Sequence, residues 1–326
     1  MIHSKVVRER EDLTQYQGIY VSMNELVALR GADLKLDLKG NRKALASMAG
    51  GHRSAFRGRG IDFDEVRIYQ PGDDVRNIDW RVTARSGTPH TKLFREERER
   101  PVYLVVDQRQ PMFFGSKNAF KSVVAARVAA SLAWATRASG DRIGGFLFND
   151  RDVQEVRPKD GKRGIQNFFR ILLQFNQALE LNGNQEPGSR QSFIQALQEL
   201  NHVVRPGSLL IIISDFCHYD DISQQHMNLL SRHNDILSVQ VYDNMEKQLP
   251  PPGVYGFSDG KHNLRLNTAP HELRKAYALA FVERQNQLKD MLSQLAIPLL
   301  EINTEDDIQQ RLVYSLGFKA NRGLKP

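Results

Sequence analysis

The sequence predicts an α/β protein in which a doubly wound, mostly parallel sheet follows a β-rich subdomain. From residue 102 to the end, apolar β-branched runs such as 102–106 and 209–213 alternate with segments of helical periodicity. This alternation requires crossover connections, which favour a parallel sheet covered on both faces. The first hundred residues do not show this alternation of strands and helices. They alternate short apolar runs with turn signals. We therefore expect two domains, an N-terminal one over 1–100 and an α/β one over 101–326.

The individual elements follow from local patterns. Ser22-Met23-Asn24-Glu25 has the form of a capping box and predicts a short helix, and strands are expected around 66–68 and 91–94. In the regular part we expect strands at 102–106, 143–148, 153–156, 209–214, 236–242 and 298–302, and helices at 118–139, 164–181, 192–203, 223–233, 271–295 and 305–316. The most apolar strand, 209–214, should be central, and 153–156 should lie at an edge.

Composition narrows the class of protein. Of the 326 residues, 40% are hydrophobic and 25% are charged, which is ordinary for a globular protein. A single cysteine, Cys217, excludes an internal disulfide and is typical of a reducing compartment. No apolar run approaches the roughly 18 residues that span a bilayer, and the N-terminus lacks the apolar segment of a signal peptide. We expect a cytoplasmic protein without a membrane span.

The net charge of +7 is spread along the chain, with one local exception. The loop 39–59 contains no acidic residue and several glycines, and its basic residues are Lys39, Arg42, Lys43, Arg53, Arg57 and Arg59. Such a loop could bind phosphates or an acidic partner. It could equally be a solvated loop, and we do not expect nucleic acid to be the main partner.

Two carboxylates end predicted strands, Asp107 after the first strand of the regular part and Asp215 after the central one. Ligands of open α/β sheets bind beyond the carboxyl ends of the strands, and two such carboxylates could hold a divalent cation. The pattern resembles the von Willebrand factor A domain, whose metal-ion-dependent adhesion site follows its first strand with Asp-x-Ser-x-Ser. Here Arg109 and Pro111 replace both serines. Ser192 is the nearest hydroxyl to the threonine that the resemblance implies.

The replacement at Arg109 puts a fixed positive charge where the cation would lie. We predict that Arg109 neutralises Asp107, Asp215 or both. The alternative is that Arg109 points to solvent and the two aspartates cap helices or loops. The three candidate metal ligands, Asp107, Asp215 and Ser192, would then form a degenerate site. We expect this site to hold no metal, with Mg²⁺ as the alternative.

A block of opposed charges from Arg57 to Glu99 surrounds a tight turn. Its candidate binding residues are Asp73, Asp74, Arg76, Asp79, Trp80 and Arg85. One interpretation is structural, with arginine–carboxylate pairs and the tryptophan fastening the N-terminal subdomain to the α/β domain. The other is a docking face for another protein. A metal-dependent hydrolase that uses Asp73 is a weaker alternative, because paired acids in Pro-Gly-Asp-Asp are ordinary turn chemistry.

The same block carries the most specific family signal. Residues 58–85 contain Gly-x-Gly-x-x-Phe, Arg-x-Tyr-x-Pro-Gly-Asp-Asp-x-Arg-x-Ile-Asp-Trp and Ala-Arg, which resemble the signature of the family called domain of unknown function 58. The segments 241–243 and 254–259 resemble later parts of that family. The resemblance implies a von Willebrand A-like domain, often with a degenerate metal site, and association with MoxR-type AAA+ ATPases. It implies no catalytic residues, and the transmembrane helices of many members have no counterpart in this sequence.

Taken together, these patterns predict a non-enzymatic protein-interaction module without a cofactor. The family resemblance implies that it is an adaptor or cofactor of a MoxR-type AAA+ ATPase in chaperone-like maturation or assembly, with other von Willebrand A-domain proteins as further partners. Binding of nucleic acid or another anion through loop 39–59 is the first alternative. A metal-dependent hydrolase is the second.

Overall fold

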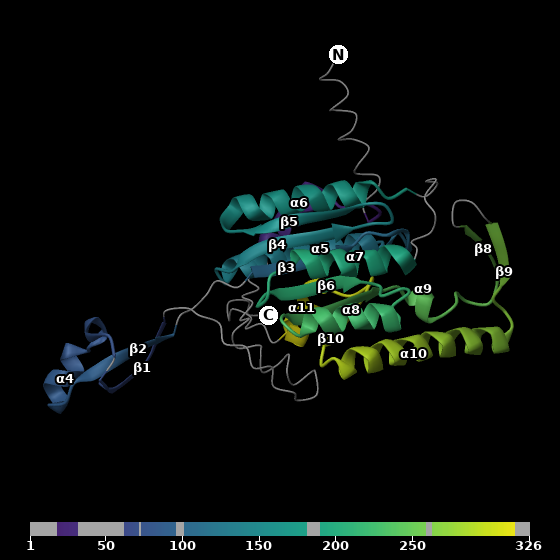
Figure 1. Cartoon of the computed structure of the whole chain (residues 1–326). Coiled ribbons are helices and arrows are strands. Elements are labelled where there is room, and N and C mark those ends of the chain that lie inside the picture. The colour runs from purple at the N-terminus through teal and green to yellow at the C-terminus, as the bar shows by residue number, and fades with distance from the viewer. Residues whose placement is uncertain are drawn as a thin grey trace, which may run out of the picture. The chain divides into compact units, whose positions relative to one another are not determined.

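The computed structural model describes residues 18–31, 62–71, 73–95, 101–180, 190–258 and 263–316. The chain divides into two compact units (Figure 1). The small unit comprises Ser54–Arg100, and the α/β unit comprises Met1–Arg53 together with Pro101–Pro326. The basic loop 39–59 and the start of the family motif, residues 57–61, lie outside the described residues.

A six-stranded sheet forms the centre of the α/β unit. Its strands are β3 (Pro101–Asp107), β4 (Arg142–Phe148), β5 (Val153–Lys159), β6 (Leu209–Ser214), β7 (Asp235–Tyr242) and β10 (Leu299–Asn303). The order is β10-β7-β6-β3-β4-β5, and every neighbouring pair is parallel except β4 and β5. This confirms the predicted doubly wound, von Willebrand factor A-like sheet, with the all-apolar β6 inside it and β5 at one edge.

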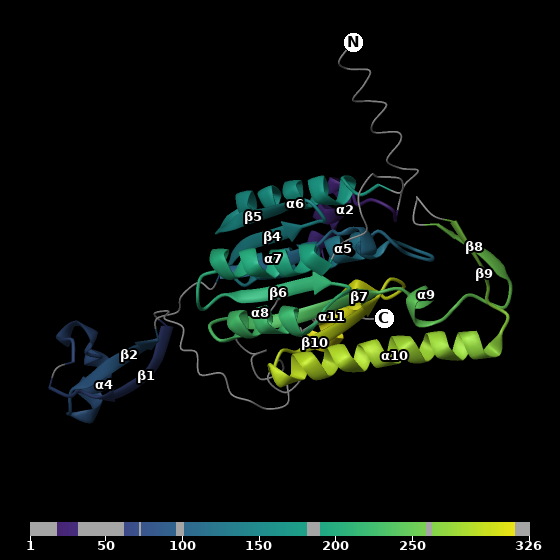
Figure 2. The same cartoon turned by 45° about the vertical axis from the view of Figure 1, so that its right-hand side comes forward.

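Helices cover both faces of this sheet (Figures 1 and 2). One hydrophobic core contains side chains of α5 (Lys121–Ala138), α6 (Gly161–Gln177) and α11 (Ile308–Leu316). The opposite core contains side chains of α7 (Arg190–Val203), α8 (Asp221–Ser231) and α10 (His271–Gln294). Helix α5 is buried around almost its whole circumference, which explains why its sequence is alanine-rich and apolar on all sides.

The predicted N-terminal helix is present as α2 (Met23–Ala28), followed by the 3₁₀ turn η1 (Leu29–Gly31). Its capping box forms as expected, since the Ser22 hydroxyl accepts from the Glu25 N–H and the Glu25 carboxylate accepts from the Ser22 N–H. Leu26 is fully buried, and the Trp134 indole N–H of α5 donates to its carbonyl oxygen at 3.0 Å. The helix therefore lies on the α/β unit, although the sequence pattern grouped it with the β-rich segment.

The small unit is a two-stranded antiparallel sheet with short helical segments in its connection. Strand β1 (Asp62–Ile68) pairs with β2 (His90–Arg95). Between them lie the 3₁₀ turn η2 (Val75–Asn77) and helix α4 (Trp80–Ser86). The sequence analysis predicted the two strands and the turn but missed α4, whose Asp79 N-cap and Gly87 C-cap are the signals that could have located it.

A second hairpin in the α/β unit was not predicted. Strands β8 (Val254–Ser258) and β9 (Asn263–Asn267) form a separate antiparallel sheet before α10. Buried Thr268 fixes its base, because its N–H donates to the Gly253 carbonyl oxygen and its hydroxyl to that of Pro251, both at 2.8 Å.

None of the helices in the described part of the chain has the length and apolar character needed to cross a membrane.

Candidate functional site

The two predicted aspartates meet at the carboxyl edge of the sheet. Strands β3 and β6 are adjacent and parallel, so Asp107 at the end of β3 lies beside Ser214 at the end of β6. The Ser214 hydroxyl donates to Asp107 Oδ2 at 2.6 Å. Asp215 follows directly, and its Oδ1 accepts the Cys217 N–H at 2.8 Å. The expected juxtaposition of carboxylates is therefore present, and each already accepts a hydrogen bond from the β6 end.

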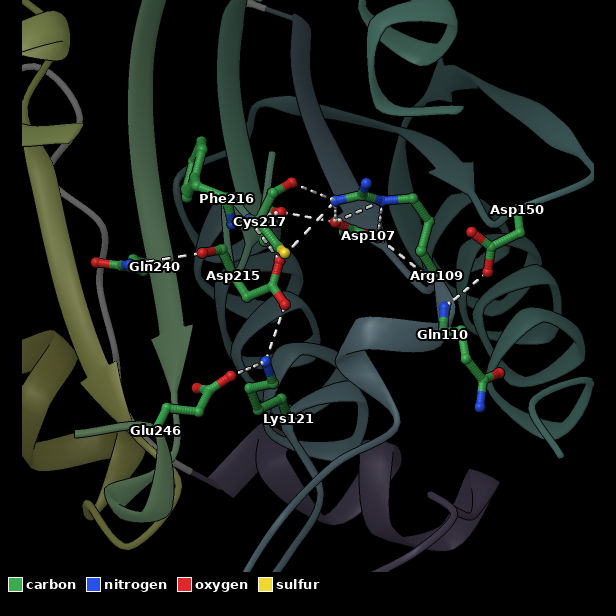
Figure 3. A network of polar contacts seen from close by, with 11 residues as sticks. Asp107, Arg109, Gln110, Lys121, Asp150, Asp215, Phe216, Cys217, Gln240 and Glu246 are labelled. Carbon is green, nitrogen blue, oxygen red and sulfur yellow. Dashed lines mark hydrogen bonds and ion pairs between the residues drawn. The ribbon is translucent and has the colours of Figure 1, made fainter. Parts of the chain in front are cut away.

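Arg109 forms an ion pair with Asp107 in the interior (Figure 3). Its Nη2 lies 2.7 Å from Asp107 Oδ2, its Nε 3.0 Å from Oδ1, and its backbone N–H also donates to Oδ1. Both side chains have 0% exposure. The guanidinium also lies over the ring of Phe193, 4.7 Å from its centroid, and Nη2 is 3.9 Å from Asp215 Oδ1. The fork is thus held by charge and by an aromatic face.

A second cation neutralises Asp215 from helix α5. Lys121 is the first residue of that helix and is 1% exposed. Its Nζ donates to Asp215 Oδ2 at 2.8 Å and to Glu246 Oε1 at 2.6 Å (Figure 3). Glu246 lies in the short helix α9 (Asn244–Lys247), which follows β7. The sequence analysis did not identify Lys121 or Glu246 as site residues.

The pKa values follow from this arrangement. Burial alone would lower the pKa of Arg109 and of Lys121, but Asp107 and Asp215 respectively outweigh it and raise both pKa values. Burial alone would raise the pKa of Asp215, but the charges of Lys121 and Arg109 outweigh it and lower that pKa. All three groups therefore stay ionised at neutral pH. Burial, reinforced by Asp215, raises the pKa of the nearby Cys217 thiol to about 11, so that thiol stays protonated.

The residues present do not fit Mg²⁺. Mg²⁺ requires oxygen ligands around a vacant centre, and here nitrogen atoms of Arg109 and Lys121 already contact both carboxylates. Within the described ranges, no group of three His, Cys, Asp or Glu residues has an arrangement that could hold a metal ion. The third predicted ligand, Ser192 in α7, donates instead to the Asp150 carbonyl oxygen at 3.4 Å. These contacts support the prediction of a degenerate site.

Polar groups beyond the ion pairs fix the loop that follows β3. The Gln110 N–H donates to Asp150 Oδ2 at 2.7 Å, and burial raises the pKa of Asp150. Gln108 is fully buried, and its side-chain N–H donates to the Ser122 carbonyl oxygen at 3.1 Å. Asn176 of α6, also fully buried, donates to Gln108 Oε1 at 3.0 Å. The chain around Arg109 is therefore held on both sides.

The next strand end along the sheet carries another buried carboxylate, Asp243 after β7. Its Oδ2 accepts from the Thr304 hydroxyl at 2.6 Å and from the Ser116 N–H at 2.9 Å, and its Oδ1 accepts from the Met245 N–H. Burial opposes ionisation, but these hydrogen bonds outweigh it and lower the pKa of Asp243. We call the loops at this edge the crest, and define it as residues 108–117, 149–152, 215–221, 243–247 and 303–307.

In the small unit, the acids of the charged block make local contacts. Asp73 pairs with Arg67 at 2.7 Å and accepts the Gln70 N–H across the turn. Asp74 caps η2, accepting from the Arg76 N–H, and Asp79 caps α4, accepting from the Arg81 and Val82 N–H groups. Turn and cap contacts of this kind are ordinary for aspartates, so they give no support to the hydrolase interpretation.

The cations and the tryptophan of that block differ from its acids. Among the residues that the structure describes, Arg76 and Arg85 have no ion-pair partner, and both are exposed. Trp80 is the first residue of α4, and its own unit leaves its side chain 67% exposed. The described part of this block contains one arginine–carboxylate pair, Arg67–Asp73, and the remaining predicted pairs stay predictions.

The six-stranded sheet with helices on both faces has the von Willebrand factor A-like architecture. Residues 65–287 match the family described as "Protein of unknown function DUF58", and the chain belongs to this family. The prediction made from residues 58–85 is confirmed. Similar proteins include the uncharacterized proteins Rv1480 of Mycobacterium tuberculosis and Mb1516 of Mycobacterium bovis. Each is 28% identical over 273 residues, which is 83% of this chain and 84% of the relative.

Two solved structures are similar to part of the chain. One is the conserved hypothetical protein BatB from Bacteroides thetaiotaomicron, with a TM-score of 0.41 and 11% identity, covering 67% of this chain and 97% of that one. The other is an aerotolerance-related membrane protein from Bacteroides fragilis, with a TM-score of 0.42 and 12% identity, covering 67% and 98%.

Proposed function

We propose that this protein is a non-enzymatic interaction module that docks through its crest onto a MoxR-type AAA+ ATPase, as an adaptor or cofactor in maturation or assembly. The observation that carries the proposal is the mutual neutralisation of Asp107, Arg109, Asp215 and Lys121. Nη1 of Arg109 has no hydrogen-bond partner, but Nε and Nη2 of Arg109 and Nζ of Lys121 contact the two carboxylates. Buried charges that are paired in this way fix the shape of loops and are not free to attack a substrate. The class of partner rests on the family resemblance. The expected cytoplasmic location stays a prediction.

The proposal assigns different roles to buried and exposed residues. Arg109 was expected among the docking residues, but its side chain has 0% exposure, so in this conformation it positions the crest and does not touch a partner. The exposed side chains of the crest are the contact residues. One is Lys117, 64% exposed, whose Nζ pairs with Glu305 Oε2 at 3.0 Å across the crest. Trp80 of the small unit is the apolar contact that we add to them.

Co-purification with the ATPase tests the proposal directly. We expect the full chain to bind a MoxR-type ATPase from the same organism and to change its rate of ATP hydrolysis. The ATPase rate is measured with and without an excess of this protein, at two salt concentrations. Absence of both binding and a rate change would refute the proposal.

A matched pair of variants locates the surface. Lys117→Glu reverses an exposed charge on the crest, whereas Lys289→Glu reverses one on α10 that is 47% exposed and pairs with Glu301, also at 3.0 Å. We expect Lys117→Glu to weaken ATPase binding by about tenfold, because a reversed interface charge repels its former partner. Lys289→Glu should bind as the wild type does. Equal loss in both variants would show that net charge, and not the crest, governs binding.

A further inference from the structure

The charge network contains two cations, Arg109 and Lys121. The residue that precedes each of them is bonded, directly or through one side chain, to the same N-terminal segment. We call residues 18–31 the strap. Phe120 precedes Lys121, and its N–H donates to the Gly18 carbonyl oxygen at 2.7 Å. Gln108 precedes Arg109 and is bonded to the strap through Asn176. The strap therefore reaches both ends of the charge network, although it makes no contact with the charges themselves among the described residues.

The connection through Asn176 is a buried relay of amides. The Val21 N–H of the strap donates to Asn176 Oδ1 at 2.9 Å, and Asn176 Nδ2 donates to Gln108 Oε1 at 3.0 Å. Both side chains have 0% exposure. A buried acceptor that loses its donor is unfavourable, so Asn176 is satisfied in this orientation only while the strap is bound. Departure of the strap would leave Gln108 held by a partner that is itself unsatisfied.

The strap combines buried apolar anchors with polar anchors nearer the surface. Leu26 and Val21 are buried, but the side chains on the outer face of α2 are exposed. The Tyr20 hydroxyl donates to the Leu179 carbonyl oxygen at 2.6 Å, and Glu25 pairs with Arg127 of α5.

We propose that the strap regulates the crest, with Asn176 and Gln108 as the positioning residues that transmit its state. When the strap is bound, Arg109 and Lys121 are held in their ion pairs and the crest has one shape. When the strap is released, the loop 107–113 loosens and the docking surface changes. This inference deepens the proposed function, because it rests on the crest being the docking surface. The coupling itself can be tested without any partner.

Hydrogen–deuterium exchange of the full chain measures this coupling. Tyr20→Phe with Glu25→Gln removes two anchors of the strap and leaves every crest residue unchanged. We expect faster exchange in residues 18–31 and, by about tenfold, in residues 107–113, since local openings that share contacts are cooperative. Glu301→Gln, which breaks a comparable surface pair with Lys289, is the control and should alter neither segment. Faster exchange of the strap with an unchanged 107–113 segment would overturn the proposal.

Two further variants test the relay itself and the coupling in the opposite direction. Val21→Pro deletes the donated N–H itself, so it tests the relay even if the double variant leaves the strap bound. Arg109→Met tests the reverse direction, because coupling between two sites is reciprocal and loosening the crest must speed exchange in the strap. An unchanged strap in Arg109→Met would contradict the proposal. ATPase binding is measured separately, so loss of coupling with intact binding refutes the regulation alone.

Discussion

The Nη2 of Arg109 lies 2.7 Å from Oδ2 of Asp107, and neither side chain has any exposed surface. A buried pair of this kind costs desolvation energy to form, but removing one partner leaves an uncompensated buried charge. Arg109 supplies a positive charge at this position, and we therefore expect the chain not to need a divalent ion there. This pair has measurable consequences for stability and for metal binding.

Arg109→Met should destabilise the protein by about 3–5 kcal/mol, the range for breaking a buried ion pair from one side. Urea unfolding measures the change in the free energy of unfolding. Arg170→Met is the control, because Arg170 is an exposed residue of α6 that bonds only neighbouring amides, and its removal should cost less than about 0.5 kcal/mol. If both variants unfold at the wild-type urea concentration, the pair contributes nothing to stability.

The pH dependence of stability should report the second pair, Lys121–Asp215. The folded pKa of Asp215 lies below its ordinary value of 3.8, so its contribution to stability is present above pH 3.8 and is lost as the pH falls through the lower folded value. Lys121→Met removes the main charge that lowers this pKa. We expect the variant to be less stable at pH 6 and to lose less additional stability between pH 5 and pH 3 than the wild type. Parallel stability curves would contradict this account.

Sequence patterns located one half of the site and missed the other for a physical reason. Strand ends and the Arg109 replacement are local features, so Asp107, Asp215 and their neutralisation were predictable. Lys121 begins a helix fourteen residues after Asp107, and a lysine at the start of a helix is normally solvated. Only the packing of α5 against β3 and β6 brings its Nζ to Asp215. The one signal was a single lysine at the start of an alanine-rich helix that is mostly apolar.

The same distinction holds for the fold. Apolar runs identified the four inner strands β3, β4, β6 and β7, because burial on both faces leaves a strong local pattern. The β8–β9 hairpin was missed because Gly256 interrupts its first strand and it makes a separate two-stranded sheet without such burial. Likewise, α2 has clear capping signals, but its attachment to α5 and α6 depends on Leu26 and on contacts more than a hundred residues away.

Metal titration tests the degenerate site. Calorimetric titration of the wild type with Mg²⁺ and with Mn²⁺ should give no binding heat, because a divalent ion would have to displace the Arg109 guanidinium and the Lys121 ammonium from Asp107 and Asp215. The control is the same titration of Asp107→Ala, which should also give none. Micromolar binding in the wild type that disappears in Asp107→Ala would show a functional metal site and would contradict the degenerate-site interpretation.

The thiol of Cys217 offers a probe of the crest that needs no partner. Burial, together with the nearby Asp215 charge, raises its pKa from 9.0 to about 11, so at pH 8 the reactive thiolate is about a hundredfold rarer than in the unfolded chain. We expect alkylation by iodoacetamide to be slower in the folded protein by at least that factor, with the urea-unfolded protein as the reference. Lys121→Met, which removes a positive charge that favours the thiolate, should not accelerate the reaction. A folded wild type that reacts as fast as the unfolded chain would mean that the loop after β6 is open in solution.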